Sequence, residues 1–186
     1  MQAVTEWARA KTDDTTREET SDVVLIDAAA AGSRTAAVPR PTGPRFGTLV
    51  HAALATVALD ALPTQITEVV SLQARILGAP ADEIDAATAL VGAALAHPLI
   101  RRARDAWRAG RCRRETPLAC REPDGSLLEG VVDLAFEDAD GWTVVDFKTD
   151  AEIGAELPRY RRQVGLYASV ISKATGKTAK AVLLRL

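Results

Sequence analysis

The stretch that decides the fold is residues 127–150, LLEGVVDLAFEDADGWTVVDFKTD. It holds two apolar runs on either side of the Asp-Gly pair at 140–141, and such a pair between apolar runs is typical of a tight β-hairpin. The run before it, RCRRETPLACRE at 111–122, alternates in character and is followed by a second Asp-Gly pair at 124–125. We therefore expect three antiparallel strands in succession.

The last of these strands carries an acid and a lysine two positions apart, Asp146 and Lys148. Alternate side chains of a strand share one face, so these two groups project together about 6.6 Å apart, while Phe147 points to the opposite, apolar side. Asp133 on the preceding strand could lie beside Asp146 across the turn. By spacing alone, Asp146 and Lys148 also fit a surface ion pair, which stabilises a protein little.

Two carboxylates at Asp133 and Asp146 would repel each other by roughly 1 to 4 kcal/mol at about 4 Å, so a cation is expected beside them. Carboxylate oxygens are hard ligands, which favours Mg²⁺, with Mn²⁺ as a substitute. The Lys148 ammonium would then lie next to the metal, where it could orient a water molecule and stabilise charge on a phosphorane-like transition state. The pattern thus favours metal-assisted phosphodiester chemistry.

Helical spacing of apolar residues dominates the chain before these strands. It predicts a helix that begins near Gly47, carries His51 in its first turns and is stopped by Pro63. Two further helices are expected over 66–77 and 83–107, the second of them broken or restarted at its internal proline. His51 is therefore expected on a helix that precedes the acidic strands.

The C-terminal part of the chain predicts one more helix and one more strand. After a polar gap at 150–159, the residues at 160–175 have helical periodicity, and Gly176 is expected to end that helix. The final residues, 179–186, are apolar enough for a buried strand. The sequence thus predicts helices together with a sheet that contains the three antiparallel strands.

Residues 1–45 lack sustained periodicity, and their prolines and glycines interrupt regular structure near residue 45. We expect a tail or interdomain linker, partly disordered, with room for one short strand at 20–28. The domain itself is expected over 46–186. Its length is sufficient for one ordinary hydrophobic core.

Composition excludes several classes of protein. With 47% hydrophobic and 26% charged residues the chain is typical of a soluble globular protein. Neither a signal peptide nor an apolar run of membrane-spanning length is found, so we expect a cytoplasmic protein without a membrane partner. Cys112 and Cys120 are too few for a four-cysteine metal site, and free thiols are the expectation.

The net charge of −2 argues against a chain that coats nucleic acid through charge alone. Its arginines are nevertheless concentrated in two stretches. If a phosphodiester-cleaving site lies beside them they are candidate phosphate contacts, and otherwise they are solvated faces. These residues are Arg101, Arg102, Arg104, Arg108, Arg111, Arg113, Arg114 and Arg121 in the first stretch, and Arg159, Arg161 and Arg162 in the second.

Four segments in register over 45–186 resemble the RecB-like branch of the PD-(D/E)xK nucleases: GTLVHAAL, ETPL, GVVDLAFEDADGWTVVDFKTD and QVGLYA. The resemblance implies an α/β fold with a central, mostly antiparallel or mixed β-sheet flanked by α-helices, a restriction-endonuclease-like core. It also implies a Mg²⁺-dependent deoxyribonuclease, acting as exonuclease or endonuclease in DNA end processing and recombinational repair. The expected partners are DNA, as single strands or duplex ends, and a helicase domain or subunit.

The resemblance also assigns roles to residues. Asp133 and Asp146 match the acids of the motif and would hold the metal together with the backbone carbonyl of Phe147, and Lys148 matches its lysine. His51 matches a helical histidine that is a metal ligand in the family. A lone histidine in an alanine-rich helix is otherwise more often a core or surface group.

The last of the four segments places Gln163 and Tyr167 one helical turn apart, on the same face of the C-terminal helix. In the family this pair lies by the active site, where it contacts the substrate or braces the site, so both join the expected catalytic group. A polar residue and a tyrosine at a helix–sheet boundary is the structural alternative. Glu115 is a weaker candidate, because Arg113 and Arg114 beside it offer an ordinary ion pair.

The expected reaction is in-line attack on phosphorus by a water molecule that Lys148 orients, leaving a 5′-phosphate and a 3′-hydroxyl. The chain contains no GxxxxGK[ST] loop, so it would rely on a helicase partner or act as a free-standing nuclease. One alternative is a catalytically idle module that binds DNA ends as a scaffold. Another is a nuclease that acts on RNA or on branched nucleic acid.

Overall fold

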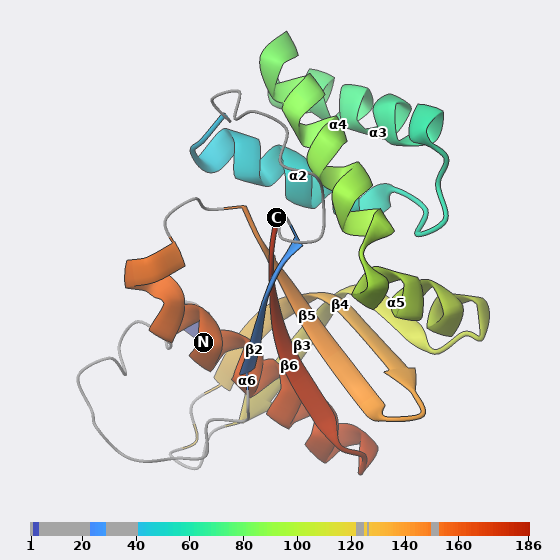
Figure 1. Cartoon of the computed structure of the whole chain (residues 1–186). Helices are drawn as coiled ribbons and strands as arrows, with labels where there is room; N and C mark the ends of the chain where they lie inside the picture. The colour runs from blue at the N-terminus through green and yellow to red at the C-terminus, as the bar shows by residue number, and fades with distance from the viewer. Residues whose placement is uncertain (1, 4–22, 29–40, 122–124, 126, 150–152) are drawn as a thin grey trace. The chain divides into compact units, whose positions relative to one another are not determined.

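The structure, a computed structural model, describes residues 2–3, 23–28, 41–121, 125, 127–149 and 153–186 (Figure 1). The chain forms two compact units. The first comprises Met1–Ile26, Ala106–Asp146 and Glu152–Leu183, and contains most of a sheet and its helix. The second comprises Asp27–Asp105, Phe147–Ala151 and Leu184–Leu186, and is mainly helical.

The three antiparallel strands predicted from the two Asp-Gly pairs are present. They are β3 (Cys112–Arg121), β4 (Leu127–Asp138) and β5 (Gly141–Lys148). β3 pairs antiparallel with β4 from Cys112↔Phe136 to Arg121↔Leu127, and β4 pairs antiparallel with β5 from Asp138↔Gly141 to Leu134↔Val145. Gly141 has φ 99°, a left-handed value that glycine adopts without steric cost, and it directly follows the two turn residues at 139–140. Asp124 of the other predicted turn lies outside the described residues.

The sheet is mixed, as expected. The described residues give it six strands in the order β1-β4-β5-β6-β2, with β3 paired to β4. β1 (Gln2–Ala3) runs parallel to β4. Hydrogen bonds from the Trp142 amide to the Thr178 carbonyl and from the Leu186 amide to the Lys148 carbonyl, both 2.9 Å, show that β5 and β6 (Ala179–Arg185) also run parallel.

One short strand was predicted at 20–28, and β2 (Val23–Asp27) occupies that place as the last strand in the sheet order. It falls within the segment 1–45 that we predict to be a tail or linker, most of which lies outside the described residues. The domain boundary near residue 45 therefore stays a prediction.

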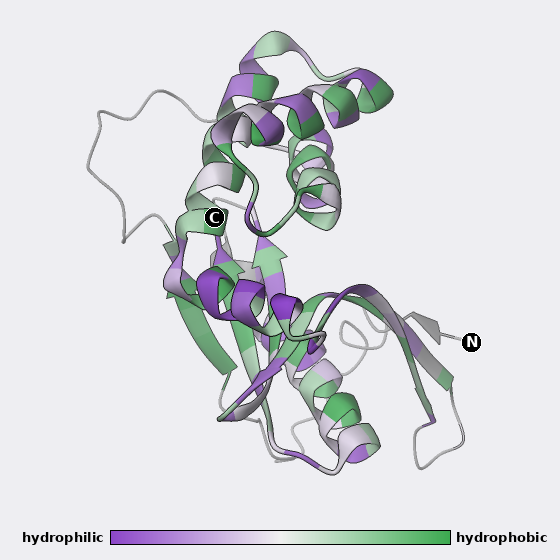
Figure 2. Ribbon diagram, turned by 90° about the vertical axis from the view of Figure 1, so that its right-hand side faces the viewer, coloured by the Kyte–Doolittle hydropathy of each residue, from purple (hydrophilic) through white to green (hydrophobic). Residues whose placement is uncertain are grey.

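The core of the first unit lies between the sheet and helix α6 (Ile153–Thr175). Side chains from α6 pack on residues of β4, β5 and β6. Figure 2 shows hydrophobic segments of the sheet in green. Removing this apolar surface from water is the main favourable contribution to folding. The buried members are Val132, Ala135, Val144, Tyr160, Val164, Tyr167, Ala168, Ile171, Ala181 and Leu183.

Helix α6 begins earlier than the sequence predicted. The segment 150–159 was expected to be a polar gap, but α6 starts at Ile153 and carries Pro158 inside it. Proline removes one helical hydrogen bond, yet Pro158 is exposed, and its neighbours Leu157 and Tyr160 pack on the core. Burial of these two neighbours favours the longer helix. Its end at Gly176, with φ 68°, is where we expected it.

The second unit contains helices α2 (Pro44–Thr56), α3 (Pro63–Leu77) and α4 (Ala81–Ala96), followed by α5 (Pro98–Arg108), which crosses into the first unit. The restart at Pro98 is confirmed. The first helix was predicted to run to Pro63, and this was wrong, because Val57 leaves the helix with extended backbone. Val57 and Leu59 are buried beyond the helix end, and Pro63 instead begins α3.

An ion pair joins the start of α2 to the first turn of α4. The Arg45 guanidinium donates from Nη2 and Nε to the Glu83 carboxylate, at 2.8 and 3.1 Å. Within the described residues, no single helix is long and apolar enough to cross a membrane. α4 and α5 together have the length and composition for it, but they are bent by 70° at their junction.

Candidate active site

Asp133 lies where β4 changes the face that it presents to α6. Val132 and Ala135 both belong to the core against α6, although residues three apart in a regular strand point to opposite faces. The alternation is therefore broken between them, at Asp133 and Leu134. Such irregularities in strands are frequent beside active sites, where they redirect a side chain.

The same place is the end of the pairing between β4 and β5. Their ladder stops at Leu134↔Val145, so Asp133 and Asp146 are the first residues beyond its paired part. Further along the same side, β4 pairs with β1 at Leu128 and Glu129. Asp133 thus lies on a stretch of strand edge between two partner strands, and its side chain is half-buried.

Asp146 is the most buried of the predicted site residues that carry a charge, with 6% of its surface exposed. Its Oδ2 atom is shielded from solvent. An ionised carboxylate in such a place needs compensation by hydrogen bonds or by a cation. The burial of Asp146 therefore argues against the alternative that Asp146 and Lys148 are an ordinary ion pair on the surface.

The Tyr167 hydroxyl is affected by the charges of both acids. Burial raises its pKa above the ordinary value, hydrogen bonds from Gln163 and from the Val131 backbone lower it, and the negative charges of Asp146 and Asp133 raise it. The charges of both carboxylates therefore act on the same hydroxyl. The three groups come from β4, β5 and α6 of the first unit.

Gln163 holds this tyrosine from within the same helix. Its Nε2 donates a hydrogen bond of 3.0 Å to the Tyr167 hydroxyl oxygen. This hydrogen bond confirms that the two residues share one face of the helix. Tyr167 is buried in the core between α6 and the sheet, and Gln163 is half-buried beside it.

Gly130 is a residue whose importance the sequence reasoning missed. A Cβ built on Gly130 would stand 2.5 Å from the Tyr167 hydroxyl oxygen and 2.8 Å from its Cε1. Only a residue without a side chain lets the tyrosine reach β4 so closely. Glycine inside a strand often marks the close approach of another group, which is the signal that could have identified it.

The remaining predicted site residues lie in the second unit. The His51 ring on α2 meets the Phe147 ring edge-on, with 6.4 Å between the ring centroids. A Cβ on Gly47 would lie 3.0 Å from Oγ1 of Thr149, so α2 passes close to the chain after the acid-x-lysine pattern. Phe147 is buried and follows Asp146 directly, while Lys148 is half-buried at the end of β5. A role of His51 in metal binding stays a prediction.

Glu115 lies opposite Asp133. The pairs Arg114↔Leu134 and Thr116↔Val132 place it there, between two regular positions of β3. It has φ 46°, the one positive φ at a non-glycine position among the described residues. This left-handed conformation is unfavourable for a residue with a side chain, and such outliers gather at functional sites. Its side chain is exposed.

Two carboxylates fit a hard divalent cation. Within the described residues, no group of three or more His, Cys, Asp or Glu side chains is placed to hold a metal ion. A Mg²⁺ ion does not need one, because it keeps several water ligands and commonly binds through one or two carboxylates plus substrate phosphates. The buried Asp146 and its neighbour Asp133 supply that minimal set.

Most of the chain is similar to one family of nucleases. The sequence pattern of the PD-(D/E)XK nuclease superfamily matches residues 28–186. That range covers α2, β3, β4, β5, α6 and β6, and with them every candidate site residue. The mixed sheet with flanking helices agrees with the restriction-endonuclease-like core that the resemblance implied.

Individual relatives match a shorter part, and those compared are ATP-dependent helicase/nuclease proteins. The one from Lachnoclostridium phytofermentans is 40% identical over 58 residues, which is 29% of this chain and 4% of that protein. The protein from Alkaliphilus oremlandii is 34% identical over 67 residues, which is 34% of this chain and 6% of that protein. The protein from Acetivibrio thermocellus is 41% identical over 58 residues, which is 29% of this chain and 5% of that protein. The matched part thus spans a small fraction of the relatives' length, whereas the superfamily pattern covers most of this chain.

Three observations agree with one another. Asp133 and Asp146 lie just beyond the paired part of β4 and β5, a lysine follows two positions after Asp146, and the superfamily pattern matches residues 28–186. The chain belongs to the PD-(D/E)XK nuclease superfamily.

Proposed function

We propose that this chain is a metal-dependent deoxyribonuclease that hydrolyses phosphodiester bonds with Mg²⁺, for which Mn²⁺ can substitute. Asp133 and Asp146 would hold the cation with the backbone carbonyl of Phe147. The resemblance also gives the imidazole of His51 as a ligand, although the described residues place no three His, Cys, Asp or Glu side chains around one ion. When bound, such a cation would lower the pKa of water and offset negative charge on the phosphate. The substrate class is DNA, as single strands or duplex ends.

The observation that carries this proposal is the position of Asp133 and Asp146, the first residues past the paired part of β4 and β5. Both charges act on one buried hydroxyl, that of Tyr167. Bringing two carboxylates together without a cation is unfavourable by about 1 kcal/mol in water and more in a less polar site. A hydrophobic or neutral pair would serve stability better, so the acids support a binding role.

Lys148 is the proposed partner of the reacting phosphate. In a strand it shares a face with Asp146. Its ammonium donates hydrogen bonds and carries a fixed positive charge, so it can orient water for in-line attack and stabilise the extra negative charge on the phosphorus oxygens. Gln163 and Tyr167 complete the proposed catalytic group by fixing the acidic side of the site against α6.

The names of the relatives, ATP-dependent helicase/nuclease subunits, support a proposed cellular role. We propose that the chain works in DNA end processing and recombinational repair, together with a helicase domain or subunit, in the cytoplasm. A helicase would supply single strands from duplex ends. The nuclease would then cut strands that have already been separated.

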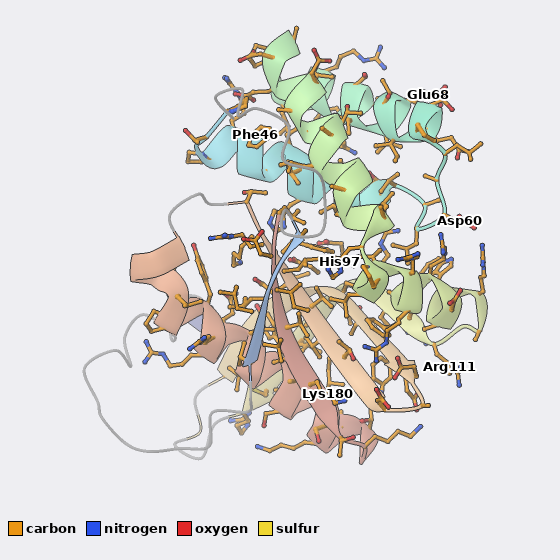
Figure 3. The ribbon with its side chains drawn as sticks, viewed as in Figure 1. Phe46, Asp60, Glu68, His97, Arg111 and Lys180 are labelled. Atoms are coloured by element: carbon orange, nitrogen blue, oxygen red, sulfur yellow. The ribbon has the colours of Figure 1, made fainter. Side chains whose placement is uncertain are left out.

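Cleavage by purified variants tests the chemistry. Asp146→Asn and Lys148→Met should each lower the rate of Mg²⁺-dependent cleavage of single-stranded and linear duplex DNA by at least about a hundredfold, as loss of a charge-stabilising group commonly does. Matched controls exist on the same sheet: Asp140→Asn and Lys180→Met replace an exposed ion pair with 3.7 Å between its charged atoms. Figure 3 labels Lys180 on β6.

The outcomes separate the alternatives. Retained activity in Asp146→Asn or Lys148→Met, with control variants unchanged, would overturn the assignment of these residues. A wild-type protein that binds DNA but cleaves neither DNA nor RNA with Mg²⁺ or Mn²⁺ would instead be an idle end-binding module. Comparison of single strands, duplex ends, flaps and RNA at one salt concentration decides the preferred substrate.

A further inference from the structure

The turn between α5 and β3 is a rigid, hydrogen-bonded helix end. The Arg111 amide donates to the Ala106 carbonyl at 2.8 Å and the Gly110 amide to the Trp107 carbonyl at 2.9 Å. This is the Schellman pattern, in which a left-handed residue, here Gly110 with φ 71°, closes the helix. The Arg113 guanidinium adds a bond from Nη1 to the Gly110 carbonyl at 3.2 Å. The turn therefore holds Trp107 and Arg111 in a fixed relation.

Trp107 is exposed on this turn. More than half of its surface, 52%, is accessible, and among the exposed large hydrophobic residues in the described part of the chain it is the one aromatic. A tryptophan left in water has a flat apolar surface that another flat ring can cover. Its fixed backbone means that little conformational entropy is lost when such a ring binds.

Arginines are frequent in the sequence on both sides of this tryptophan. Between residues 101 and 121 the sequence has eight arginines and two acids, Asp105 and Glu115. Arg108 and Arg111 are exposed on the same turn as Trp107 (Figure 3 labels Arg111). The acid nearest in register to Arg111 is Glu137, whose amide donates to the Arg111 carbonyl, and its carboxylate is already bound by Lys177. Residues 105–111 carry Arg108 and Arg111 against one acid, the exposed Asp105, so this segment has a net positive charge.

The distance from this turn to the acidic site suits a polymeric ligand. Arg111 lies opposite Glu137 on β4, and Asp133 is four residues further along that strand. At about 3.3 Å per residue the separation along the strand is roughly 13 Å. A nucleic-acid strand cut beside Asp133 and Asp146 would extend over several nucleotides, far enough to reach the turn.

We propose that Trp107, Arg108 and Arg111 form a contact surface for single-stranded DNA, on which Trp107 stacks with an unpaired base and the two arginines bind backbone phosphates. Stacking on a tryptophan favours single-stranded over duplex DNA. An unpaired base can offer its whole face to a side chain, whereas bases in a duplex are already stacked. The substrate class rests on the proposed nuclease function, while the surface itself rests on the exposed tryptophan, the arginines and the rigid turn.

Binding measured without cleavage tests this surface. Fluorescence anisotropy of a short labelled oligothymidylate is followed with the full chain in EDTA, so that no divalent ion supports hydrolysis. Trp107→Ala should weaken binding by about 5- to 150-fold, the range expected for loss of one base–aromatic stack, and Trp107→Phe should keep most of the affinity. Arg111→Gln should reduce the slope of log K against log salt by about 0.7.

Matched controls come from α3, where Ile76 and Arg75 are also exposed. Ile76→Ala and Arg75→Gln should bind the oligothymidylate as the wild type does. Because Trp107 is exposed, Trp107→Ala should fold normally, which circular dichroism and the urea midpoint check. Unchanged affinity in Trp107→Ala overturns the proposal and leaves Trp107 as a contact for a protein partner.

Failure of this surface and failure of the nuclease assignment give different results. If the wild type cleaves DNA but Trp107→Ala binds the oligothymidylate normally, the surface is wrong and the nuclease assignment stands. If Trp107→Ala loses binding but the wild type cleaves nothing with any divalent ion, the surface stands and the nuclease assignment is wrong.

Discussion

The hydroxyl of Tyr167 on α6 lies directly over Gly130 on β4, 2.5 Å from the place that a Cβ of residue 130 would occupy. Gly130 stands three residues before Asp133, so the glycine and the acid of the GVVD segment serve one arrangement. The tyrosine reaches β4 because the glycine leaves room. Two sequence segments that lie far apart thus meet at a single contact beside the acids.

Gly130→Ala should displace Tyr167 and lower nuclease activity strongly. The added methyl group overlaps the tyrosine ring, and overpacking of this kind typically costs about 1 to 3 kcal/mol of stability. The control is Gly165→Ala on α6, where the nearest atom of the described residues to a Cβ would be Val23 Cγ2, at 3.8 Å. That variant should be neutral or stabilised by up to about 1 kcal/mol, since alanine favours helices over glycine. Urea denaturation and DNA cleavage measure both variants, and equal behaviour would contradict the close approach.

Tyr167→Phe should fold and lose activity through loss of the hydroxyl alone. The Gln163 amide and the Val131 backbone would lose their partner, at a cost of about 1 kcal/mol for each hydrogen bond left unmade in a buried site. A double-mutant cycle with Gln163→Met measures the coupling, which should be about 0.5 to 1.5 kcal/mol in stability. Additive effects of the two changes would show that the hydrogen bond contributes nothing.

The half-buried position of His97 predicts that the folded protein becomes less stable when the pH falls slightly below neutral. Its Nδ1 accepts a hydrogen bond from the Leu99 amide at 3.2 Å, which caps the start of α5 (Figure 3). Burial, and then the charge of Arg101, lower the His97 pKa, so the neutral form is the folded one. Its contribution to stability is complete above the unfolded pKa of about 6.5 and is lost as pH falls through the lower folded value.

The variant His97→Asn keeps an acceptor at the cap but does not titrate. Urea midpoints of the wild type should fall between about pH 7.5 and pH 5, and the difference between wild type and His97→Asn should shrink or reverse over that interval. His97→Ala should cost about 1 kcal/mol at neutral pH through loss of the cap. An identical pH dependence in wild type and His97→Asn would contradict this role.

Cys112 should resist alkylation at moderately alkaline pH. Its side chain is buried, and burial raises the pKa of its thiol to about 11 against the opposing charges of Arg114 and Arg113. The reactive thiolate is therefore scarce near about pH 8. Cys120, which is half-buried on the same strand, should be labelled first by iodoacetamide, as peptide mass spectrometry would show. Equal labelling rates in the native protein would contradict the burial of Cys112.

The sequence predicted the elements whose signals are local. The Asp-Gly pair at 140–141 lies between apolar runs and indicated the hairpin of β4 and β5, because turn residues and alternation act within a few positions. The acid-x-lysine pattern placed Asp146 and Lys148 on one strand for the same reason. The strand at Val23–Asp27 and the helix restart at Pro98 were found from equally local signals.

Helix ends were less predictable, because packing decides them. Pro63 was expected to stop the first helix, yet Val57 already leaves it and is buried in extended conformation. Pro158 was expected to precede the last helix, yet the helix continues through it. In both places the burial of neighbouring apolar side chains outweighs a local preference that is worth only a few kcal/mol at most.

The sequence by itself thus determined which chemical groups the protein has and which strand or helix carries each of them. Only the tertiary structure decided that β4 breaks its alternation at Asp133, that Asp133 and Asp146 lie at the end of one ladder, and that Gly130 admits the Tyr167 hydroxyl. The physical reason is the distance along the chain over which the interactions act. Turns and alternation depend on neighbours along the chain, whereas close approach depends on the shapes of surfaces that meet only after the chain has folded.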